Sequence, residues 1–326
     1  MPAVVQTPTA PVESMMAHSW LAEDQKAAFS TSQFVPDLVS VSAYLGPWLK
    51  SKGLTSAAIK ANGLCIRDRY VTSCLMNQAL DFLQRALCNT AAQYLLGEKG
   101  LETWARVTNY YASYFCVHCL LCLQGRTITT LHLDTALHVQ IVPLALRDHE
   151  FFITTRQVGR NPHHVTPWYR YYEIYDRYAV PRTEYEAVAR KAYVVEPSDE
   201  AIERNAINYA PFAGFREIRD LARHLEFKGL FSTYVSDLEA KNSFEEFLAD
   251  LQGYASDPEH KYFARSLLKF ALAGEIIRSI RSVSPHIEAE WASVTQRWRG
   301  LLGTVFPDPT KCYLLKFIPL VGSAPN

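Results

Sequence analysis

The sequence has no excess of either charge, no long apolar run and none of the short motifs that mark the most common enzyme classes. Its 33 lysines and arginines balance 33 aspartates and glutamates, so no global field favours nucleic acid or an anionic membrane, although a local groove can still be basic. No apolar segment reaches the roughly 20 residues that a membrane-spanning helix needs. The absence of a glycine-rich phosphate loop, a GxSxG elbow and an HExxH helix excludes the corresponding nucleotide-binding, hydrolase and zinc-protease signatures.

The N-terminal segment and the cysteines indicate where the chain works. The first 25 residues contain no lysine or arginine and no continuous apolar stretch, so we expect no secretory signal. Residues 1–35 are rich in Ala, Pro, Ser and Thr and are predicted to be a flexible lead-in. The seven cysteines are odd in number and most lie inside apolar runs, which predicts reduced thiols in a cytoplasmic protein.

The middle of the chain predicts a helical hairpin followed by short strands. Apolar residues recur at helical spacing over residues 70–96 and 101–123, with the sequence GEKG between these segments, which favours two antiparallel helices. Gly125 follows in the position of a helix C-cap. Three β-branched and aromatic runs come next, and they predict a small antiparallel sheet. These runs are residues 127–132, 137–144 and 151–157.

Helical patterns resume in the second half of the chain. Ser198 is predicted to cap a helix that Pro211 ends, and Ser243 with Glu246 forms a capping-box pattern. The expected helices after the first of these are residues 215–227, 244–254, 261–283 and 287–302. The predicted fold class is mainly α: a helical bundle over residues 36–230 with a small antiparallel β and aromatic insertion at about 127–180, and a C-terminal helical region, 231–326, packed on the bundle.

Cys116, Cys119 and Cys122 recur every third residue, so they share one face of the second helix, with His118 between them. A structural zinc site needs four ligands, usually two from each of two separate elements. No second cysteine pair is present, so we interpret these thiols as core residues that fill space between helices. A thiol-based metal or redox role is the weaker alternative, and the sequence predicts neither a metal nor a cofactor.

The same helix carries a pattern that resembles a known family. Tyr110, Tyr111 and Ala112 are followed by Phe115, by the leucine pair at 120–121 and by Gly125. This order is similar to the tyrosine-bearing helix of the HEPN superfamily, the nucleotide-binding helical-bundle domains of higher eukaryotes and prokaryotes. The resemblance implies a ligand such as RNA, because many HEPN members are metal-independent endoribonucleases of toxin–antitoxin or phage-defence systems. Other members have lost catalysis.

A later helix resembles the second motif of that family, which places an arginine, a polar residue and, after a short spacer, a histidine. Here Arg204 and Asn205 take the first two places, and Tyr209 stands where the family usually has histidine. The resemblance implies that Arg204 binds a phosphate and that Asn205 orients a neighbour. A tyrosine, with a reference pKa of roughly 10, is a poor base at neutral pH, so the substitution favours binding without catalysis or with slow catalysis.

Arg219 and His224 satisfy the same spacing with a true histidine. On one helix these two residues lie about 140° apart, on either side of the apolar stripe formed by Phe215, Ile218 and Leu225. In the homodimer that the resemblance implies, they would line a groove between subunits as phosphate ligand and acid or base. The opposing interpretation is an ordinary amphipathic helix with a solvated face.

Residues 147–191 interleave arginines with aromatic residues. Such a segment can hold single-stranded RNA, because rings stack on bases while guanidinium groups bind phosphates. Nearby acidic residues cancel much of the charge, so a packed interface is the competing use of the rings. His163 and His164 are an adjacent pair whose default interpretation is a solvated loop.

Two functions therefore remain open. One is a HEPN-like ribonuclease that cleaves RNA by attack of the 2′-hydroxyl group, as a homodimer and with an antitoxin or regulatory protein as a further partner. The other is a catalytically inactive binding or regulatory protein of the same fold. Neither needs a membrane.

Overall fold

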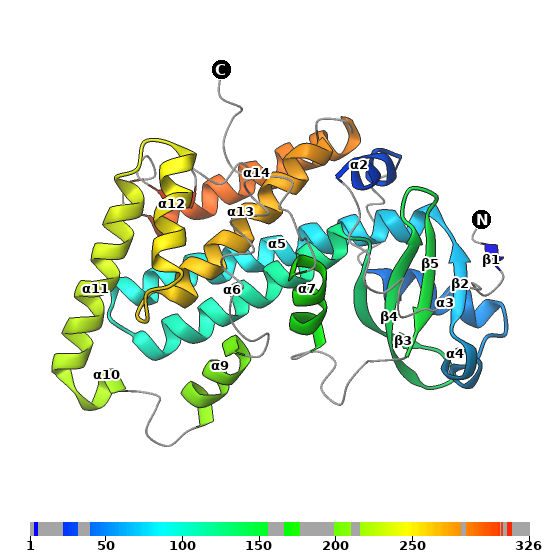
Figure 1. Ribbon diagram of the computed structural model, residues 1–326, viewed down its shortest axis with the longest axis horizontal. Helices are drawn as coiled ribbons and strands as arrows, with labels where there is room; N and C mark the ends of the chain where they lie inside the picture. Colours follow the sequence, from blue (N-terminus) through cyan, green and yellow to red (C-terminus); the bar gives the residue numbers. More distant parts are fainter. Residues whose placement is uncertain are drawn as a thin grey trace. The chain divides into compact units, whose positions relative to one another are not determined.

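The computed structural model describes residues 3–5, 22–31, 40–155, 166–176, 199–209, 216–281, 285–306, 308 and 312–314. It is mainly helical with one small antiparallel sheet (Figure 1), which confirms the predicted fold class. The helices are α2 (Ala22–Ser30), α3 (Val41–Ser51), α4 (Ser56–Asn62), α5 (Arg69–Glu98), α6 (Glu102–Leu123), α7 (Thr166–Asp176), α9 (Asp199–Tyr209), α10 (Arg216–Arg219), α11 (Leu221–Glu239), α12 (Phe244–Tyr254), α13 (Lys261–Arg281) and α14 (Pro285–Val305). The strands are β1 (Ala3–Val5), β2 (Leu64–Arg67), β3 (Thr127–His132), β4 (Ala136–Ala145) and β5 (Glu150–Thr154). No helix in the described ranges combines the length and apolarity that crossing a bilayer requires.

The chain forms two compact units, each built from three separate segments. Unit 1 comprises residues 1–82, 117–177 and 279–290, and unit 2 comprises residues 83–116, 178–278 and 291–326. Four of the five boundaries fall inside the helices α5, α6, α13 and α14. The sheet belongs to unit 1, and the polar site described below belongs to unit 2.

The sheet in unit 1 has the strand order β1-β2-β5-β4-β3, with every pairing antiparallel. Figure 1 shows β2 (light blue) beside β5 (green). The prediction of strands β3, β4 and β5 is confirmed. The sequence did not predict β1 or β2: β1 lies in the expected lead-in, as does α2, and β2 has only four residues. Gly63 precedes β2 with a φ of 67°, and a Cβ there would lie 2.3 Å from the Phe152 ring, so close packing requires glycine at this position.

The predicted helical hairpin is present as α5 and α6. Gly100 makes the turn with a φ of 71°, and Gly125 follows α6 with a φ of 74°. Gly97 does not stop α5, which continues to Glu98. A Cβ on Gly97 would lie 2.3 Å from the ring of Phe231, so this glycine serves the packing of α11 against α5.

The predicted single helix over residues 215–227 is wrong. Helix α10 ends at Arg219, and Asp220 takes an extended backbone (φ −137°, ψ 104°) and caps α11 by accepting from Ala222 N at 2.9 Å. Aspartate at an N-cap satisfies amide groups that a continuous helix would bond internally. The expected buried stripe fails as well, because Ile218 is 74% exposed and Leu225 59% exposed; Phe215 lies outside the described residues, as do Ser198 and Pro211.

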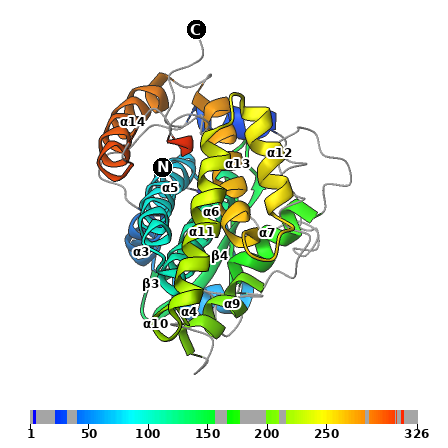
Figure 2. The same ribbon diagram turned by 90° about the vertical axis from the view of Figure 1, so that its left-hand side faces the viewer.

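Unit 2 buries an aromatic core in place of that stripe. Phe227 and Phe231 of α11 pack on Phe263 of α13, with ring centroids 6.4 and 5.5 Å apart, and the two helices lie side by side (Figure 2). Tyr234 is also fully buried, and Ser243 caps α12 as predicted, accepting from Glu246 N at 3.1 Å. This core fixes the positions from which α6, α9, α11 and α13 present their polar side chains.

Candidate polar site of unit 2

The two motif-bearing helices meet in unit 2. The Nη2 atom of Arg204 on α9 donates to the Tyr111 hydroxyl of α6 at 2.9 Å, and its Nη1 atom donates to Oδ1 of Asn205 at 3.0 Å. The guanidinium group also lies 5.8 Å from the ring centroids of Tyr110 and Tyr111. Three of the residues singled out by the resemblance, Tyr110, Tyr111 and Arg204, are therefore in contact.

The other predicted residues are not part of this cluster. Tyr209 is the last residue of α9, and its side chain lies outside what the structure describes. Arg219 is exposed at the end of α10. His224 packs its ring over Gly100, where an added Cβ would lie 2.6 Å from Cε1. In the described part of unit 2, neither Arg219 nor His224 lines a cavity with Arg204.

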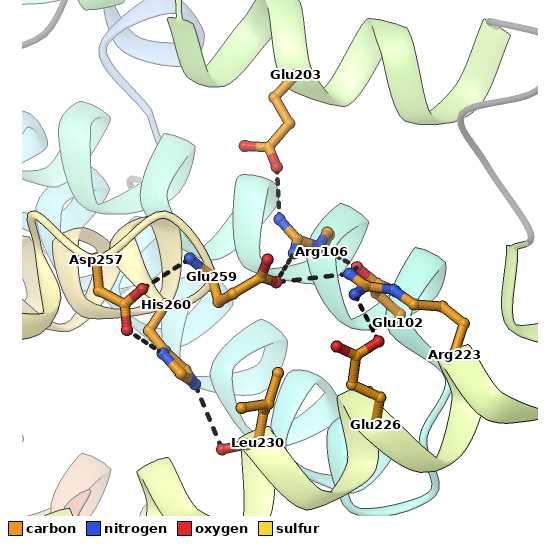
Figure 3. Close-up of polar contacts among 9 residues, drawn as sticks. All are labelled: Glu102, Arg106, Glu203, Arg223, Glu226, Leu230, Asp257, Glu259 and His260. Atoms are coloured by element: carbon orange, nitrogen blue, oxygen red, sulfur yellow. Dashed lines mark hydrogen bonds and ion pairs between the residues drawn. The ribbon is translucent and has the colours of Figure 1, made fainter.

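A network of arginines and glutamates lies beside the Arg204 contact, as Figure 3 shows. Glu102 is at its centre, with a side chain only 9% exposed. Its Oε1 atom accepts from Arg106 Nε at 3.0 Å and from Arg223 Nη2 at 2.8 Å, and its Oε2 atom accepts from Arg223 Nε at 2.9 Å. One carboxylate of α6 thereby joins a guanidinium group of its own helix to one of α11.

Two further carboxylates close the network from other elements. Arg106 Nη1 donates to Glu203 Oε1 of α9 at 2.9 Å, and Glu259, which precedes α13, lies 3.5 Å from both Arg106 and Arg223. The turn that carries Glu259 is held by Asp257, whose side chain accepts from Glu259 N at 3.0 Å and contacts His260 Nδ1 at 2.6 Å (Figure 3). The network therefore ties α9 and this turn to the α6 surface.

A cavity of about 360 Å³ opens at the network. Charged groups of both signs line it together with the Tyr262 side chain, and the principal lining residues are Glu102, Arg106, Glu203, Arg223, Lys261 and Tyr262. A smaller cavity adjoins it and shares Arg106, Glu203 and Tyr262 with the first, while adding Arg204 and Asn109. Asn109 is 2% exposed, and its Oδ1 atom has no hydrogen-bond partner among the described residues. The smaller cavity thus links the Arg204 contact to the larger one.

The two buried glutamates have opposite pKa shifts. Burial alone would raise the pKa of Glu102, but hydrogen bonds from Arg223 and the charges of Arg106 and Arg223 outweigh burial and hold that pKa below its ordinary value. Burial raises the pKa of Glu203, and the charge and hydrogen bond of Arg106 do not fully offset it. One guanidinium contact compensates for burial less than three do. Glu203 is therefore the carboxylate of the pair that accepts a proton more readily.

A buried lysine lies deeper in unit 2. Lys269 of α13 is 0% exposed, and its Nζ atom donates to Glu200 Oε1 at 2.6 Å and to Ser113 Oγ at 2.7 Å. Burial lowers the pKa of this amine, although the charge of Glu200 acts in the opposite direction. Sequence reasoning missed Lys269; its signal was a lysine inside the apolar stretch SLLKFALAG.

The cysteine group behaves as core. Cys116, Cys119 and Cys122 are all 0% exposed, and burial raises the pKa of the Cys122 thiol to about 12. Metal binding requires thiolates. Across the residues that the structure describes, no three His, Cys, Asp or Glu side chains gather closely enough to hold a metal ion.

The arginine-rich aromatic segment is described only in part. Trp168 and Tyr171 of α7 are 1% and 0% exposed, so these rings pack in unit 1 and are not available for base stacking. The predictions for Arg156, Arg160, the histidine pair 163–164 and the arginines at 177, 182 and 190 lie outside the described residues.

No protein-family model, no curated protein and no solved structure matches this chain.

Proposed function

We propose that this protein is a HEPN-like RNA-binding protein that holds a phosphate group of single-stranded RNA at the polar site of unit 2. The observation that carries the proposal is the placement of Arg204: the Tyr111 hydroxyl fixes its guanidinium group beside a cavity that also contains Arg106. A guanidinium group presents a fixed fork of donors that suits phosphate oxygens. The volume of the larger cavity, about 360 Å³, lies in the usual range of small-ligand pockets.

An anion can bind Arg106 only if a carboxylate of the site leaves this arginine. Arg106 already contacts Glu203 at 2.9 Å and Glu102 at 3.0 Å. Because its pKa is raised, Glu203 gives up its charge at the lowest cost. We therefore infer that a phosphate replaces Glu203 at Arg106 while Glu203 takes up a proton, and that RNA affinity rises as the pH falls toward the pKa of Glu203.

Aromatic groups favour an unpaired strand. Tyr262 lines the larger cavity and is half-buried, whereas Tyr110 of the smaller cavity is 4% exposed and is not available for stacking. Unpaired bases stack on such rings with little sequence preference, whereas bases in a duplex are already stacked. Single-stranded RNA is accordingly the ligand class that the site fits.

Cleavage is the second candidate, and Glu203 is the observation that favours it. A general acid or base works best when its pKa is close to the working pH, and Glu203 is a carboxyl group with a raised pKa at the cavity. In that mechanism, the fraction of Glu203 that remains ionised would accept the proton of a ribose 2′-hydroxyl group as its oxygen attacks the phosphorus. The bond from phosphorus to the 5′-oxygen breaks, and the leaving oxygen takes a proton from water. Tyr209 and His224 would not be needed.

The experiment is a titration of fluorescently labelled single-stranded RNA, followed by anisotropy. Arg204→Ala is expected to weaken binding about tenfold or more, as the loss of a charge-assisted hydrogen bond does. Arg219→Ala is the matched control, because it removes an exposed arginine of the same unit that lines neither cavity. Absence of RNA binding, or equal affinities for the two variants, would refute the proposal.

Cleavage is assayed on the same RNA with and without a chelator. Loss of product with Glu203→Gln, without loss of RNA affinity, would support the enzyme. Retention of activity in Glu203→Gln would exclude this role of Glu203. Absence of product from the native protein would favour the binding function alone. The homodimer and the antitoxin partner remain predictions that light scattering and co-purification can test.

A further inference from the structure

A second cavity, of about 380 Å³, lies in unit 1 at the start of α5. The segment that joins β2 to α5 forms one wall, and the turn between β4 and β5 forms the other. The basic and aromatic residues that line it are Arg67, Arg69, Tyr70, Arg147 and His149. None of these residues belongs to the site proposed above.

His149 holds the β4–β5 turn in place. Its backbone has a φ of 58°, a conformation that costs energy for a residue with a side chain and is maintained only where its surroundings enforce it. Its carbonyl oxygen accepts from Asp68 N at 2.9 Å. Its ring nitrogens lie 2.9 Å from the Thr72 hydroxyl and 3.1 Å from the Thr31 hydroxyl. The turn, and with it Arg147, is therefore fixed against the start of α5.

The arginines of this cavity are less neutralised than those of unit 2. Within the described ranges, Arg69 and Arg147 form no ion pair; Arg69 only lies over the Tyr70 ring, 5.4 Å from its centroid. Arg67 is 57% exposed; its Nε atom donates to the Asp148 carbonyl oxygen at 3.2 Å, and its carboxylate partners, Asp148 at 4.0 Å and Glu150 at 3.8 Å, are distant. Exposed pairs at such distances contribute little.

Asp68 does not neutralise the cavity either, because its oxygens have other partners. Its Oδ2 atom accepts from the Tyr44 hydroxyl at 2.6 Å, and its Oδ1 atom accepts from Tyr70 N at 2.8 Å. Asp68 thus caps α5, and its carboxylate is engaged on both sides. The three guanidinium groups consequently retain donors for an incoming anion.

We propose that this cavity binds a phosphomonoester. A terminal phosphate carries a charge of about −1.5 to −2 and three acceptor oxygens, which matches three arginines that line one cavity from two chain segments. A carboxylate has a single charge and two oxygens, so it would leave one arginine without a partner. The phosphate can come from a free mononucleotide or from the 5′ end of an RNA, and the two sources share the chemistry that the arginines recognise.

The test is calorimetric titration of the full-length protein with adenosine monophosphate, with adenosine as the ligand without phosphate. A 12-mer RNA in 5′-phosphate and 5′-hydroxyl forms provides the second arm, on the order of the site sizes of single-strand binders. Saturable binding of the monophosphate and no binding of adenosine are expected. A preference for the 5′-phosphate RNA over both the monophosphate and the 5′-hydroxyl RNA would identify an RNA end as the source, and equal affinity for the monophosphate would identify the free nucleotide.

Variants assign the binding to this cavity. Arg69→Ala and Arg147→Ala are each expected to weaken monophosphate binding about tenfold or more, and both residues are exposed, so the fold is retained. Lys60→Ala, an exposed cation of unit 1 outside the cavity, and Arg204→Ala in unit 2 are expected to bind normally. The proposal is overturned if the monophosphate does not bind at millimolar concentrations or if neither arginine variant alters its affinity. The Arg204→Ala result separates this outcome from a failure of the RNA site in unit 2.

Discussion

Replacing Glu102 tests whether the arginine–glutamate network of unit 2 is a structural clamp. Glu102→Ala leaves two guanidinium groups, with side chains 14% and 20% exposed, without their shared carboxylate. Removing one partner of a buried ion pair costs about 3–5 kcal/mol. Glu203 and Glu259 still contact Arg106 after the change, so the lower end of that range, about 3 kcal/mol, is expected. For a chain of 326 residues this corresponds to a Tm lower by about 4 °C.

Glu226→Ala is the matched control for this prediction. Glu226 pairs with the same Arg223 at 3.2 Å, but its side chain is 60% exposed, and exposed pairs contribute less than about 1 kcal/mol. The assay is urea unfolding followed by circular dichroism, with scanning calorimetry for Tm. Equal losses of unfolding free energy in the two variants would refute the reasoning, because burial would then not decide the strength of these pairs.

Four further changes test the same physical account. Lys269→Met should destabilise unit 2 by about 3–5 kcal/mol in urea unfolding, because it leaves Glu200 buried and unpaired. The double variant Lys269→Met with Glu200→Gln should recover most of that stability. Failure to recover it would contradict an ion-pair origin of the loss. Gly97→Ala should lower the free energy of unfolding by about 1–3 kcal/mol, because its Cβ would meet the Phe231 ring at 2.3 Å. Gly229 is a helical glycine with open space around it, so Gly229→Ala should raise the free energy of unfolding by about 0.5–1 kcal/mol. Changes of the same sign in both variants would contradict the packing argument. Because the pKa of Glu203 is raised in the folded state, its contribution to stability is complete below the unfolded pKa of 4.5 and is lost as the pH rises through the folded pKa. In a series of Tm measurements between acidic and neutral pH, Glu203→Gln should therefore remove this loss. Glu102 has the opposite sign: its contribution is present above 4.5 and is lost as the pH falls through its lowered pKa, so Glu102→Gln should flatten the acid limb of the same series.

Elements with a clear apolar period were predictable from the sequence. Helices α5 and α6 and strands β3 to β5 have the expected ranges because each buries a continuous face. The break at Asp220 was not predicted, because residues 215–227 retain a helical period on both sides of the cap. Ile218 and Leu225 supplied that period, yet both are exposed, while α11 buries Phe227 and Phe231 instead.

The candidate site was predictable only where a motif marked it. The resemblance singled out Arg204, Tyr110 and Tyr111, and the structure brings these three residues into contact. Arg106 and Arg223 carried no such mark, because charged residues on amphipathic helices are the usual pattern of a solvated face. Only the tertiary arrangement, which brings Glu102, Glu203 and Glu259 to them from three elements, turns those charges into a buried network.

Helix α9 packs on the rest of unit 2 mainly through polar side-chain contacts. Among the side chains of α9 that the structure describes, Ile207 is buried and apolar, and the other contacts with unit 2 are polar. Those contacts include Glu200 with Lys269, Glu203 with Arg106 and Tyr262, and Arg204 with Tyr111. A helix held mainly by pairing depends on the charge state of its partners far more than one held by apolar area. In the proposed function, an anion that takes Arg106 would remove one polar attachment of α9 while it engages Arg204 on the same helix, so ligand binding and the docking of α9 would be coupled through the protonation of Glu203.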